Sequence, residues 1–349
     1  MSPFDTLPDL GGAAQPLLSV DTLTKHFPLG GGVLAPKKTV RAVDGVSFTI
    51  AKGETLGIVG ESGCGKSTTA RLLMHLMPAS SGEILFDGQL VGEEISLREF
   101  RRGMQMVFQD SYASLNPRLT IEDSIAFGPK VHGVRDREAR VLARDLMDKV
   151  GLRPEVFANR YPHEVSGGQR QRVNIARALA LKPRLVILDE AVSALDKSVE
   201  AQVLNLLTDL KREFGLTYLF ISHDLNVVRY ISDRVLVMYL GQVVELGPVD
   251  EVWDGPAHPY TRALLAAMPA TDPDQRTMTA PITGDPPNPI DPPPGCRFHT
   301  RCVFAEPICG ARCPALAPVR GGAHLAACHM VITGSGHSLA PAAAAGEAA

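Results

Sequence analysis

The order of apolar and polar positions predicts short strands that alternate with helices along most of the chain. Continuous apolar segments, which predict buried strands, occupy residues 55–59, 184–188, 217–222 and 235–240. Apolar side chains at helical spacing follow the first segment through Leu76, where Pro78 is expected to close the helix, and recur over residues 199–214. The charged, periodic stretch 118–180 also predicts helices. This alternation indicates an α/β domain with a mainly parallel sheet.

A change in composition near residue 270 predicts a second region. Residues 280–295 contain seven prolines, which helices and central strands do not tolerate, so an extended linker is expected there. We therefore expect one folded domain over residues 17–270 and a Pro- and Cys-rich C-terminal extension over residues 271–335. The two ends, residues 1–16 and 336–349, are expected to be disordered.

Length and composition narrow the class of protein. The chain has 349 residues, which fits two domains on a prior of roughly 150 residues each. Lys plus Arg is 35 and Asp plus Glu is 38, and the net charge of −3 argues against a nucleic-acid partner. No apolar run approaches the ~20 residues that span a bilayer, and residues 1–10 carry no secretory signal. We therefore expect a cytosolic chain whose membrane role, if it has one, depends on a partner.

A phosphate-binding loop is the first candidate site. Residues 60–67 match the pattern G-x-x-x-x-G-K-[ST] between a predicted strand and a predicted helix, as in P-loop NTPases. Backbone N–H groups and the helix N-terminus would bind phosphate, Lys66 would reach the β- and γ-phosphates, and Ser67 would bind Mg²⁺. A Gly-rich turn with a solvated lysine is the alternative, and the strand–loop–helix context disfavours it. The expected ATP-binding residues here are Gly60, Glu61, Ser62, Gly63, Cys64, Gly65, Lys66, Ser67 and Thr68.

Two acids, Asp189 and Glu190, directly follow the apolar strand 185–188. In a parallel sheet this position lies at the carboxyl edge, beside the phosphate loop. Asp189 can hold Mg²⁺, and Glu190 can act as a general base on the attacking water. Two acids after a strand can also simply cap a helix, but the phosphate loop favours the catalytic interpretation.

The family is identified by a second motif that could bind phosphate at a helix N-terminus. This motif is Val-Ser-Gly-Gly-Gln at residues 165–169. The sequence here resembles the ATP-binding subunits of ABC transporters, whose signature most often reads Leu-Ser-Gly-Gly-Gln; Val165 replaces the leucine at a packing position. The resemblance implies a RecA-like α/β core, an antiparallel β subdomain and a helical subdomain that carries the signature. It also implies a head-to-tail dimer with ATP held between the phosphate loop of one subunit and the signature of the other.

The same resemblance assigns roles to further residues. Gln109 matches the glutamine that contacts Mg²⁺ and the attacking water, and His223 matches the histidine near the γ-phosphate. Phe27 aligns with the aromatic residue that stacks on adenine. In the family, segment 111–119 after Gln109 forms the groove for a permease helix, and we expect Tyr112 and Leu115 to be exposed there. Residues expected to act on the ATP of the partner subunit are Ser166, Gly167, Gly168, Gln169 and Asp196.

Segments 258–265, 286–299 and 327–329 resemble the C-terminal part of oligopeptide and dipeptide importers. This implies an ATPase at the cytoplasmic face of the membrane, two permease subunits, an external solute-binding protein and a second ATPase chain, related or identical. Nickel importers share the extension, so another solute such as nickel is an alternative. A soluble ABC ATPase of DNA repair or translation usually has two cassettes or a coiled-coil insertion. A metal-cluster sensor that only binds ATP would not need Glu190 and His223.

Five of the six cysteines lie between residues 296 and 328. In a reducing compartment such a group indicates metal binding before disulfides, and four thiolates can hold a [4Fe–4S] cluster or Zn²⁺. The resemblance favours a cluster on Cys296, Cys302, Cys309 and Cys328, with zinc or metal-free thiols as alternatives and Cys313 as an extra residue. The cluster would staple a segment that can bury little on its own. Arg297, Arg301 and Arg320 could offset its negative charge, with ordinary surface positions as the alternative.

Overall fold

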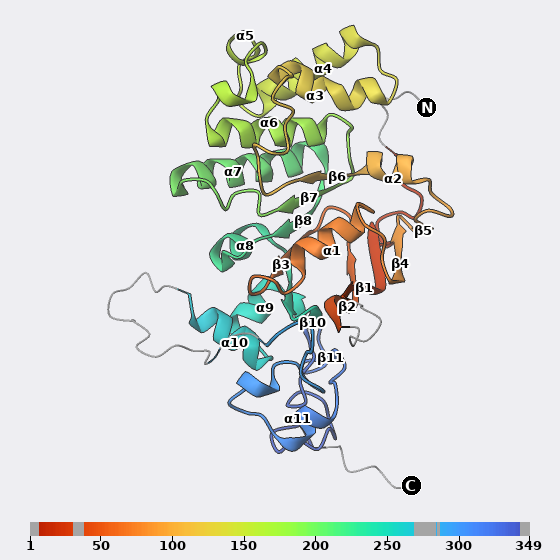
Figure 1. Ribbon diagram of the computed structural model, residues 1–349, viewed down its shortest axis with the longest axis vertical. Helices are drawn as coiled ribbons and strands as arrows, with labels where there is room; N and C mark the ends of the chain where they lie inside the picture. The colour runs from red at the N-terminus through yellow and green to blue at the C-terminus, as the bar shows by residue number, and fades with distance from the viewer. Residues whose placement is uncertain (1–6, 31–37, 269–283, 285–286, 343–349) are drawn as a thin grey trace.

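The computed structural model describes residues 7–30, 38–268, 284 and 287–342 of the chain (Figure 1). Two β-sheets organise these residues, with strand orders β2-β1-β4-β5 and β11-β12-β10-β9-β3-β8-β7-β6. The smaller, antiparallel sheet contains β1 (Leu18–Leu29), β2 (Lys38–Ile50), β4 (Ser81–Phe86) and β5 (Gln89–Leu90). The larger sheet contains β3 (Thr55–Val59), β6 (Met104–Val107), β7 (Leu185–Asp189), β8 (Thr217–Ile221), β9 (Arg234–Tyr239), β10 (Gln242–Pro248), β11 (Ala317–Pro318) and β12 (Leu325–Ala326).

The centre of the larger sheet is parallel, as the alternating pattern predicted. β3 pairs in parallel with β8 and β9, and β7 pairs in parallel with β6 and β8. Every residue of β3, β7 and β8 is buried, because helices cover one face of the sheet and the smaller sheet, together with the helix Lys66–Leu73, covers the other. The carboxyl ends of these strands therefore lie along one edge, which is where open α/β sheets bind their ligands.

Two groups of helices surround the sheet. The helices nearest to it and in the C-terminal half are α1 (Lys66–Leu73), α2 (Leu97–Gly103), α7 (Lys197–Phe214), α8 (Leu225–Ile231), α9 (Val249–Asp254), α10 (Pro259–Ala266) and α11 (Pro307–Ala311). A second group gathers at one end of the molecule: α3 (Ile121–Val131), α4 (Asp136–Lys149), α5 (Pro154–Phe157) and α6 (Gly167–Leu179) (Figure 1). In α4 the buried residues Ala139, Ala143 and Leu146 share one face, which packs on this group while the charged face meets solvent. No helix in the described part of the chain is both long and apolar enough to cross a membrane.

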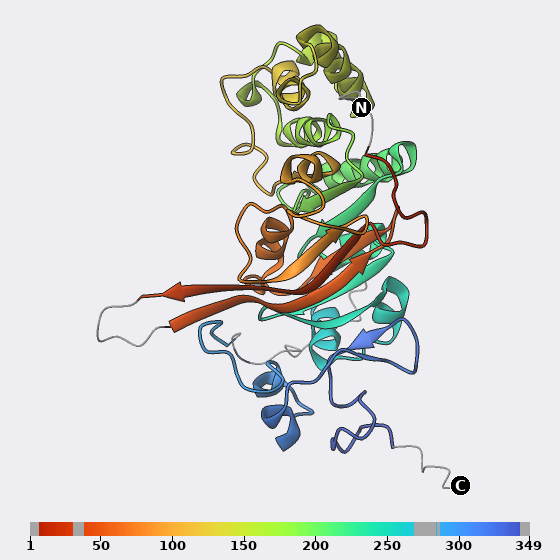
Figure 2. The ribbon, with the colours of Figure 1, turned by 90° about the vertical axis from the view of Figure 1, so that its right-hand side faces the viewer.

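Strands β1 and β2 form a long two-stranded ribbon. Their register runs from Leu18 opposite Ile50 to Leu29 opposite Lys38. Figure 2 shows this ribbon reaching beyond the body of the protein, so its outer half lies far from the larger sheet.

The C-terminal region joins the larger sheet directly. β12 pairs antiparallel with β10, where Glu245 lies opposite Ala326, and β11 adds beyond it. Glu245 is fully buried and accepts hydrogen bonds from the backbone N–H groups of Ala257 and His258, while His324 Nε2 lies 2.6 Å from its carboxylate. These partners satisfy a carboxylate that would be costly to bury alone.

Three expectations about local structure are corrected. Helix α1 ends at Leu73 instead of continuing to Pro78, because His75 adopts a left-handed φ of 50°, and Leu76 is 50% exposed. Residues 7–16 are not disordered, since Leu10 N–H donates to Asp87 Oδ2 at 2.8 Å. Residues 336–342 are also placed, with His337 buried and its Nε2 2.9 Å from the Phe304 carbonyl oxygen. The predicted disorder of residues 1–6 and 343–349, and most of the predicted linker up to residue 286, lie outside the described residues.

Candidate active site

The phosphate loop is held tightly against neighbouring backbone. Gly60 has φ 147° and Gly65 has φ 112°, and a Cβ at these positions would lie 2.2 Å from Met238 O and 2.3 Å from Ala42 O. Only glycine therefore fits at either position. Lys66, which is 6% exposed, donates from Nζ to Gly60 O at 2.7 Å and to Glu61 O at 3.1 Å. The ammonium group is thus fixed inside the loop, where it faces whatever the loop encloses.

The end of β7 brings an acid to the first turn of α1. Ser67 Oγ donates to Asp189 Oδ1 at 3.0 Å. Burial raises the pKa of Asp189. The hydrogen bond from Ser67 lowers it in part, and the negative charge of the neighbouring Glu190 raises it further. A cation beside Asp189 would favour its charged form, and two hard oxygen donors at this spacing suit Mg²⁺.

Two predicted catalytic residues, Gln109 and His223, converge on one carboxylate oxygen of the third, Glu190. Gln109 Nε2 donates to Glu190 Oε2 at 2.7 Å, and His223 Nδ1 lies 3.5 Å from the same oxygen. Glu190 has a left-handed φ of 48°, and its N–H donates to Ile221 O at 2.9 Å, which fixes it between β7 and β8. A non-glycine residue in this conformation costs on the order of 1 kcal/mol, so the surrounding structure determines its position.

These residues share one cavity of about 540 Å³. Its lining consists of Ala42, Ser62, Gly63, Gly65, Lys66, Ser67, Thr68, Gln109, Glu190 and His223. Ala42 is the member that the sequence did not indicate, because its side chain has no reactive group and it contributes only shape. Cys64 is buried and its pKa is raised by burial, which fits the interpretation that it is a small packing residue. The cavity offers a cation, hydroxyl groups and a carboxylate around a Gly-rich loop.

Phe27 does not line this cavity. It lies on the β1–β2 ribbon opposite Val40, is exposed, and has Lys25 Nζ 5.2 Å from its ring centroid. The structure therefore brings the other predicted groups together but leaves this aromatic ring outside.

The signature residues also do not line the cavity of their own chain. Ser166 caps α6: its Oγ accepts from Gln169 N–H at 3.3 Å, and Gln169 Oε1 accepts from Ser166 N–H at 2.9 Å. A Cβ at Gly168 would lie 2.5 Å from Val199 Cγ1, so the helix start packs closely on α7. Ser166 and Asp196, the latter at the start of α7, are both exposed.

The predicted docking segment is corrected at one position. Tyr112 is 51% exposed, as expected, and the Cζ atom of Arg170 lies 5.6 Å from the centroid of its ring. Leu115 is only 4% exposed and belongs to the same buried core as Ile121. The local alternation of apolar and polar residues could not distinguish a core position from an interface position here.

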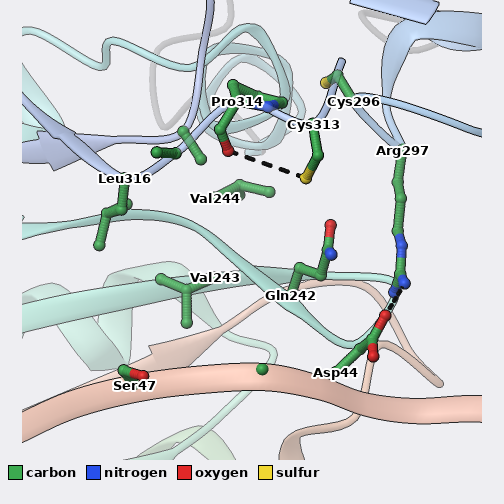
Figure 3. A pocket seen from close by; sticks show the side chains of 13 residues that line it. Asp44, Ser47, Gln242, Val243, Val244, Cys296, Arg297, Cys313, Pro314 and Leu316 are labelled. Carbon is green, nitrogen blue, oxygen red and sulfur yellow. Dashed lines mark hydrogen bonds and ion pairs between the residues drawn. The ribbon is translucent and has the colours of Figure 1, made fainter. Parts of the chain in front are cut away.

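A contact between the C-terminal region and the phosphate loop was not anticipated. Arg301 Nη1 lies 3.0 Å from Glu61 Oε2, and its Nη2 lies 3.3 Å from Oε1. The Glu61 N–H donates to Tyr260 Oη at 2.8 Å. The guanidinium therefore pairs with an acidic residue of the phosphate loop, a partner that the sequence did not indicate. Its neighbour Arg297 pairs with Asp44 on β2 (Figure 3).

Four of the cysteines line one small cavity: Cys296, Cys302, Cys309 and Cys328. Burial raises the pKa of Cys296 to about 12 and that of Cys328 to about 11, and the neighbouring thiols add to both. Cys313 lines a different cavity of about 290 Å³, which Cys296 also lines, and its Sγ is 3.9 Å from the Pro314 carbonyl oxygen (Figure 3). Within the described ranges, no group of three or more His, Cys, Asp or Glu side chains is arranged to hold a metal ion.

The geometry defines a P-loop hydrolase of nucleoside triphosphates, and two family models match the chain. Residues 43–193 match the model described as ABC transporter, and residues 244–309 match the model described as Oligopeptide/dipeptide transporter, C-terminal region. Similar curated proteins include the Probable peptide ABC transporter ATP-binding protein y4tS of Sinorhizobium fredii, 52% identical over 94% of this chain and 93% of its own. Another is the Oligopeptide transport ATP-binding protein AppF of Bacillus subtilis, 50% identical over 90% of this chain and 98% of its own. The chain belongs to the ABC transporter ATP-binding proteins and is an ATPase, which confirms the resemblance.

Solved structures agree on the fold. The protein cbiO1 from Clostridium perfringens, part of the cbiONQ transporter complex, superposes with a TM-score of 0.59 at 28% identity, over 69% of this chain and 92% of its own. The ATP-binding cassette MJ0796, in a dimeric post-hydrolysis state bound to ADP and Pi, gives a TM-score of 0.58 at 30% identity, over 66% of this chain and 98% of its own. The predicted ABC ATPase fold is therefore confirmed.

Proposed function

We propose that the chain is the ATP-hydrolysing subunit of an importer of oligopeptides or dipeptides and drives uptake through separate membrane permease subunits. The observation that carries the hydrolytic part is the convergence of Gln109 and His223 on one oxygen of Glu190, beside the phosphate loop. The solute class rests on the match of residues 244–309 and on the names of the two peptide transport relatives.

Each group at the cavity has a separate task in hydrolysis. Lys66 places its positive charge inside the loop that holds the phosphates of ATP. Ser67 and Asp189, with Gln109, would hold Mg²⁺, which neutralises charge on the phosphate oxygens when it is bound. Glu190 accepts a proton from the attacking water. The Gln109 amide holds Glu190 in place, and His223, whose Nδ1 lies 3.5 Å from Glu190 Oε2, would contact the γ-phosphate.

The complete site is proposed to need two subunits. The cavity of their own chain is not lined by Ser166, Gly167, Gly168, Gln169 or Asp196, and Ser166 and Asp196 are exposed, which supports action on the ATP of a partner subunit. The partner is a related chain or a second copy. The four-stranded sheet corresponds to the antiparallel β subdomain, and α3 to α6 correspond to the helical signature subdomain.

Phe27 remains the proposed adenine contact. Its cross-strand partner Val40 is two positions from Ala42, which lines the cavity. An adenine that extends from the phosphate site along β2 would therefore approach the Phe27 ring.

The permease is proposed to dock beside Gln109, which places the ATPase at the cytoplasmic face of the membrane. A cavity of about 370 Å³ there is lined by Arg71, Phe108, Gln109, Asp110, Ala113, Ser114 and Asp189. Phe108, which lines this cavity, and Tyr112 have exposed side chains. Asp189 and Gln109 belong to this groove and to the catalytic site, so a helix that inserts into the groove would contact residues of the catalytic site directly.

A [4Fe–4S] cluster, with Zn²⁺ as the alternative, is the proposed occupant of the cavity formed by the four cysteines. The fit has one observation in its favour and one against it. In its favour, four thiols line one small cavity, and the pKa values of Cys296, Cys302 and Cys328 are raised first by burial and then by neighbouring thiols, so the cysteines lie close together. The sulfur atoms do not stand in a metal-binding arrangement, so loading would need the side chains to turn toward one another. The cluster's role is proposed to be structural.

One pair of variants tests the hydrolytic assignment. Glu190→Gln should retain ATP binding and trap the dimer, because the amide keeps the shape but accepts no proton, whereas Lys66→Ala should weaken ATP binding. ATP hydrolysis by Glu190→Gln at the parental rate would refute the role of Glu190. Co-purification with permease subunits, followed by uptake of labelled peptide or of nickel into vesicles, tests the transport assignment and its solute.

A further inference from the structure

A network of hydrogen bonds joins segment 111–114 to helix α6. Asn174 of α6 donates from Nδ2 to the Ser111 carbonyl oxygen at 3.0 Å, and its Oδ1 accepts from Ser114 Oγ at 3.0 Å. Arg177, further along α6, donates from Nη1 to the Ser114 carbonyl oxygen. Both ends of the segment are therefore held by side chains of one helix.

Little water reaches these contacts. Asn174 is 1% exposed, and Arg177 is partly buried, so burial lowers the pKa of its guanidinium. The charged group is stable in this position because a carbonyl oxygen accepts its hydrogen bond, and bonds from charged donors are the stronger ones. Segment 111–114 and α6 should therefore move together as one body.

This body has two exposed ends. Ser114 lines the cavity of about 370 Å³ where the permease is proposed to dock, and Tyr112 is exposed. Arg170, in the first turn of α6, has its Cζ atom 5.6 Å from the Tyr112 ring centroid, so the contact extends toward the helix start. There Ser166 caps α6 and is exposed. One end thus belongs to the proposed permease surface, and the other belongs to the proposed dimer surface.

We propose that Asn174 and Arg177 are positioning residues that couple the permease to the ATP held by the partner subunit. A permease helix that displaces segment 111–114 would displace α6 with it, and Ser166 would then move relative to the ATP of the partner. The Gln109 contact proposed above acts within one chain, whereas this route acts across the dimer. The inference rests on the proposed permease docking and on the proposed shared ATP site.

Arg172 offers a matched control on the same helix. Like Arg177, it is partly buried, burial lowers its pKa, and its Nη1 donates to a backbone carbonyl oxygen, that of Val150, at 2.8 Å. Val150 lies at the end of α4 and not in segment 111–114. Loss of either arginine removes a hydrogen bond within the same group of helices, but only loss of Arg177 loosens the docking segment.

Arg177→Met, Asn174→Leu and Arg172→Met are made in the full chain, because methionine and leucine favour helices but donate no hydrogen bond. ATP hydrolysis is measured for each chain alone and after reconstitution with the permease subunits in vesicles. The three variants should have similar basal rates. The stimulation by the permease should fall about fivefold or more in Arg177→Met and Asn174→Leu, the lower end of allosteric coupling, and should persist in Arg172→Met. Arg177→Lys keeps a charged donor and should restore much of the stimulation.

A dimer with Lys66→Ala on one subunit tests the direction of the coupling. Its surviving site uses the signature of the subunit that carries Lys66→Ala, so Arg177→Met should abolish stimulation on that subunit and not on the other. Equal effects of the two placements would overturn action across the dimer. Full stimulation in Arg177→Met, or an equal loss in Arg172→Met, would overturn the coupling role and leave the permease docking intact. A parent that the permease does not stimulate would instead refute the proposed docking, and the inference with it.

Discussion

The pair between Arg301 and Glu61 should set how well the phosphate loop binds ATP. Arg301 is 7% and Glu61 23% exposed at the side chain, so water screens the pair only in part. Exposed ion pairs contribute about 0–1 kcal/mol, whereas removal of one partner from a buried pair costs about 3–5 kcal/mol. An intermediate value of about 2 kcal/mol is expected for Arg301→Gln.

Much of this loss should be visible in nucleotide binding. The Glu61 carbonyl oxygen accepts a hydrogen bond from Lys66, and its N–H is held by Tyr260, so its side chain belongs to the loop that encloses the phosphates. Without Arg301 its negative charge is unpaired beside the phosphate site and repels ATP. If the entire ~2 kcal/mol appears in binding, the dissociation constant for ATP rises about thirtyfold, and a threefold rise is the smallest effect expected.

Calorimetric titrations with ATP measure the dissociation constant, and thermal melting measures the stability, of four proteins. They are the parent, Arg301→Gln, Glu61→Gln and the double variant, which together form a double-mutant cycle. The double variant should bind ATP better than Arg301→Gln alone, because no unpaired charge is left. The reasoning is refuted if Arg301→Gln changes neither ATP binding nor the melting temperature, or if the two substitutions are simply additive.

Three further predictions concern other parts of the protein. In a dimer with Lys66→Ala on one subunit and Ser166→Arg on the other, one composite site should survive and about half of the ATPase activity should remain, whereas both changes on one subunit should disable both sites; equal activity in the two arrangements would contradict action across the interface. Tyr112→Glu should abolish transport in reconstituted vesicles while the basal ATPase rate stays within about twofold, since its side chain is exposed; a parallel loss of both would indicate a folding defect instead. Burial alone would raise the pKa of Asp87, but hydrogen bonds from Arg184, the Leu10 N–H and Lys52 outweigh it and lower the pKa to about 2. A lowered carboxyl pKa stabilises the fold above the unfolded value and is lost as pH falls through the folded value, so about 2 kcal/mol should disappear between about pH 4 and pH 2, and acid titrations of Asp87→Asn should lack this step.

The core of the fold and most of the nucleotide site were predictable because their signals are local. β3, β7 and β8 are buried on both faces, so their sequences are continuous apolar segments that need no partner to be recognised. Lys66 and Glu190 stand next to such strands, and parallel pairing then brings them to the same edge. The order of the motifs in the sequence and the parallel direction of the strands were sufficient to predict that Lys66 and Glu190 lie at the same edge of the sheet.

The features that were missed depend on distant residues. Leu115 is buried by helices that follow it in the chain, and the sequence of its own segment does not indicate that these helices cover it. Arg301 pairs with Glu61 across 240 positions, so its charge alone could suggest any acidic partner. The short strand β12 has only two residues, too few for a periodic pattern, and its pairing with β10 and β11 defines it.

The pairing of β12 with β10 also limits how the protein can be shortened. A chain cut after α10 would keep the ATPase motifs but remove the outer strands of the larger sheet. β10 would then expose a row of unpaired N–H and C=O groups, which is a template for edge-to-edge association between chains. The cut would also remove His324 from the buried Glu245 and leave that carboxylate with its backbone donors alone. Aggregation of such a truncated chain would therefore reflect an uncovered sheet edge and not a defect in the nucleotide site.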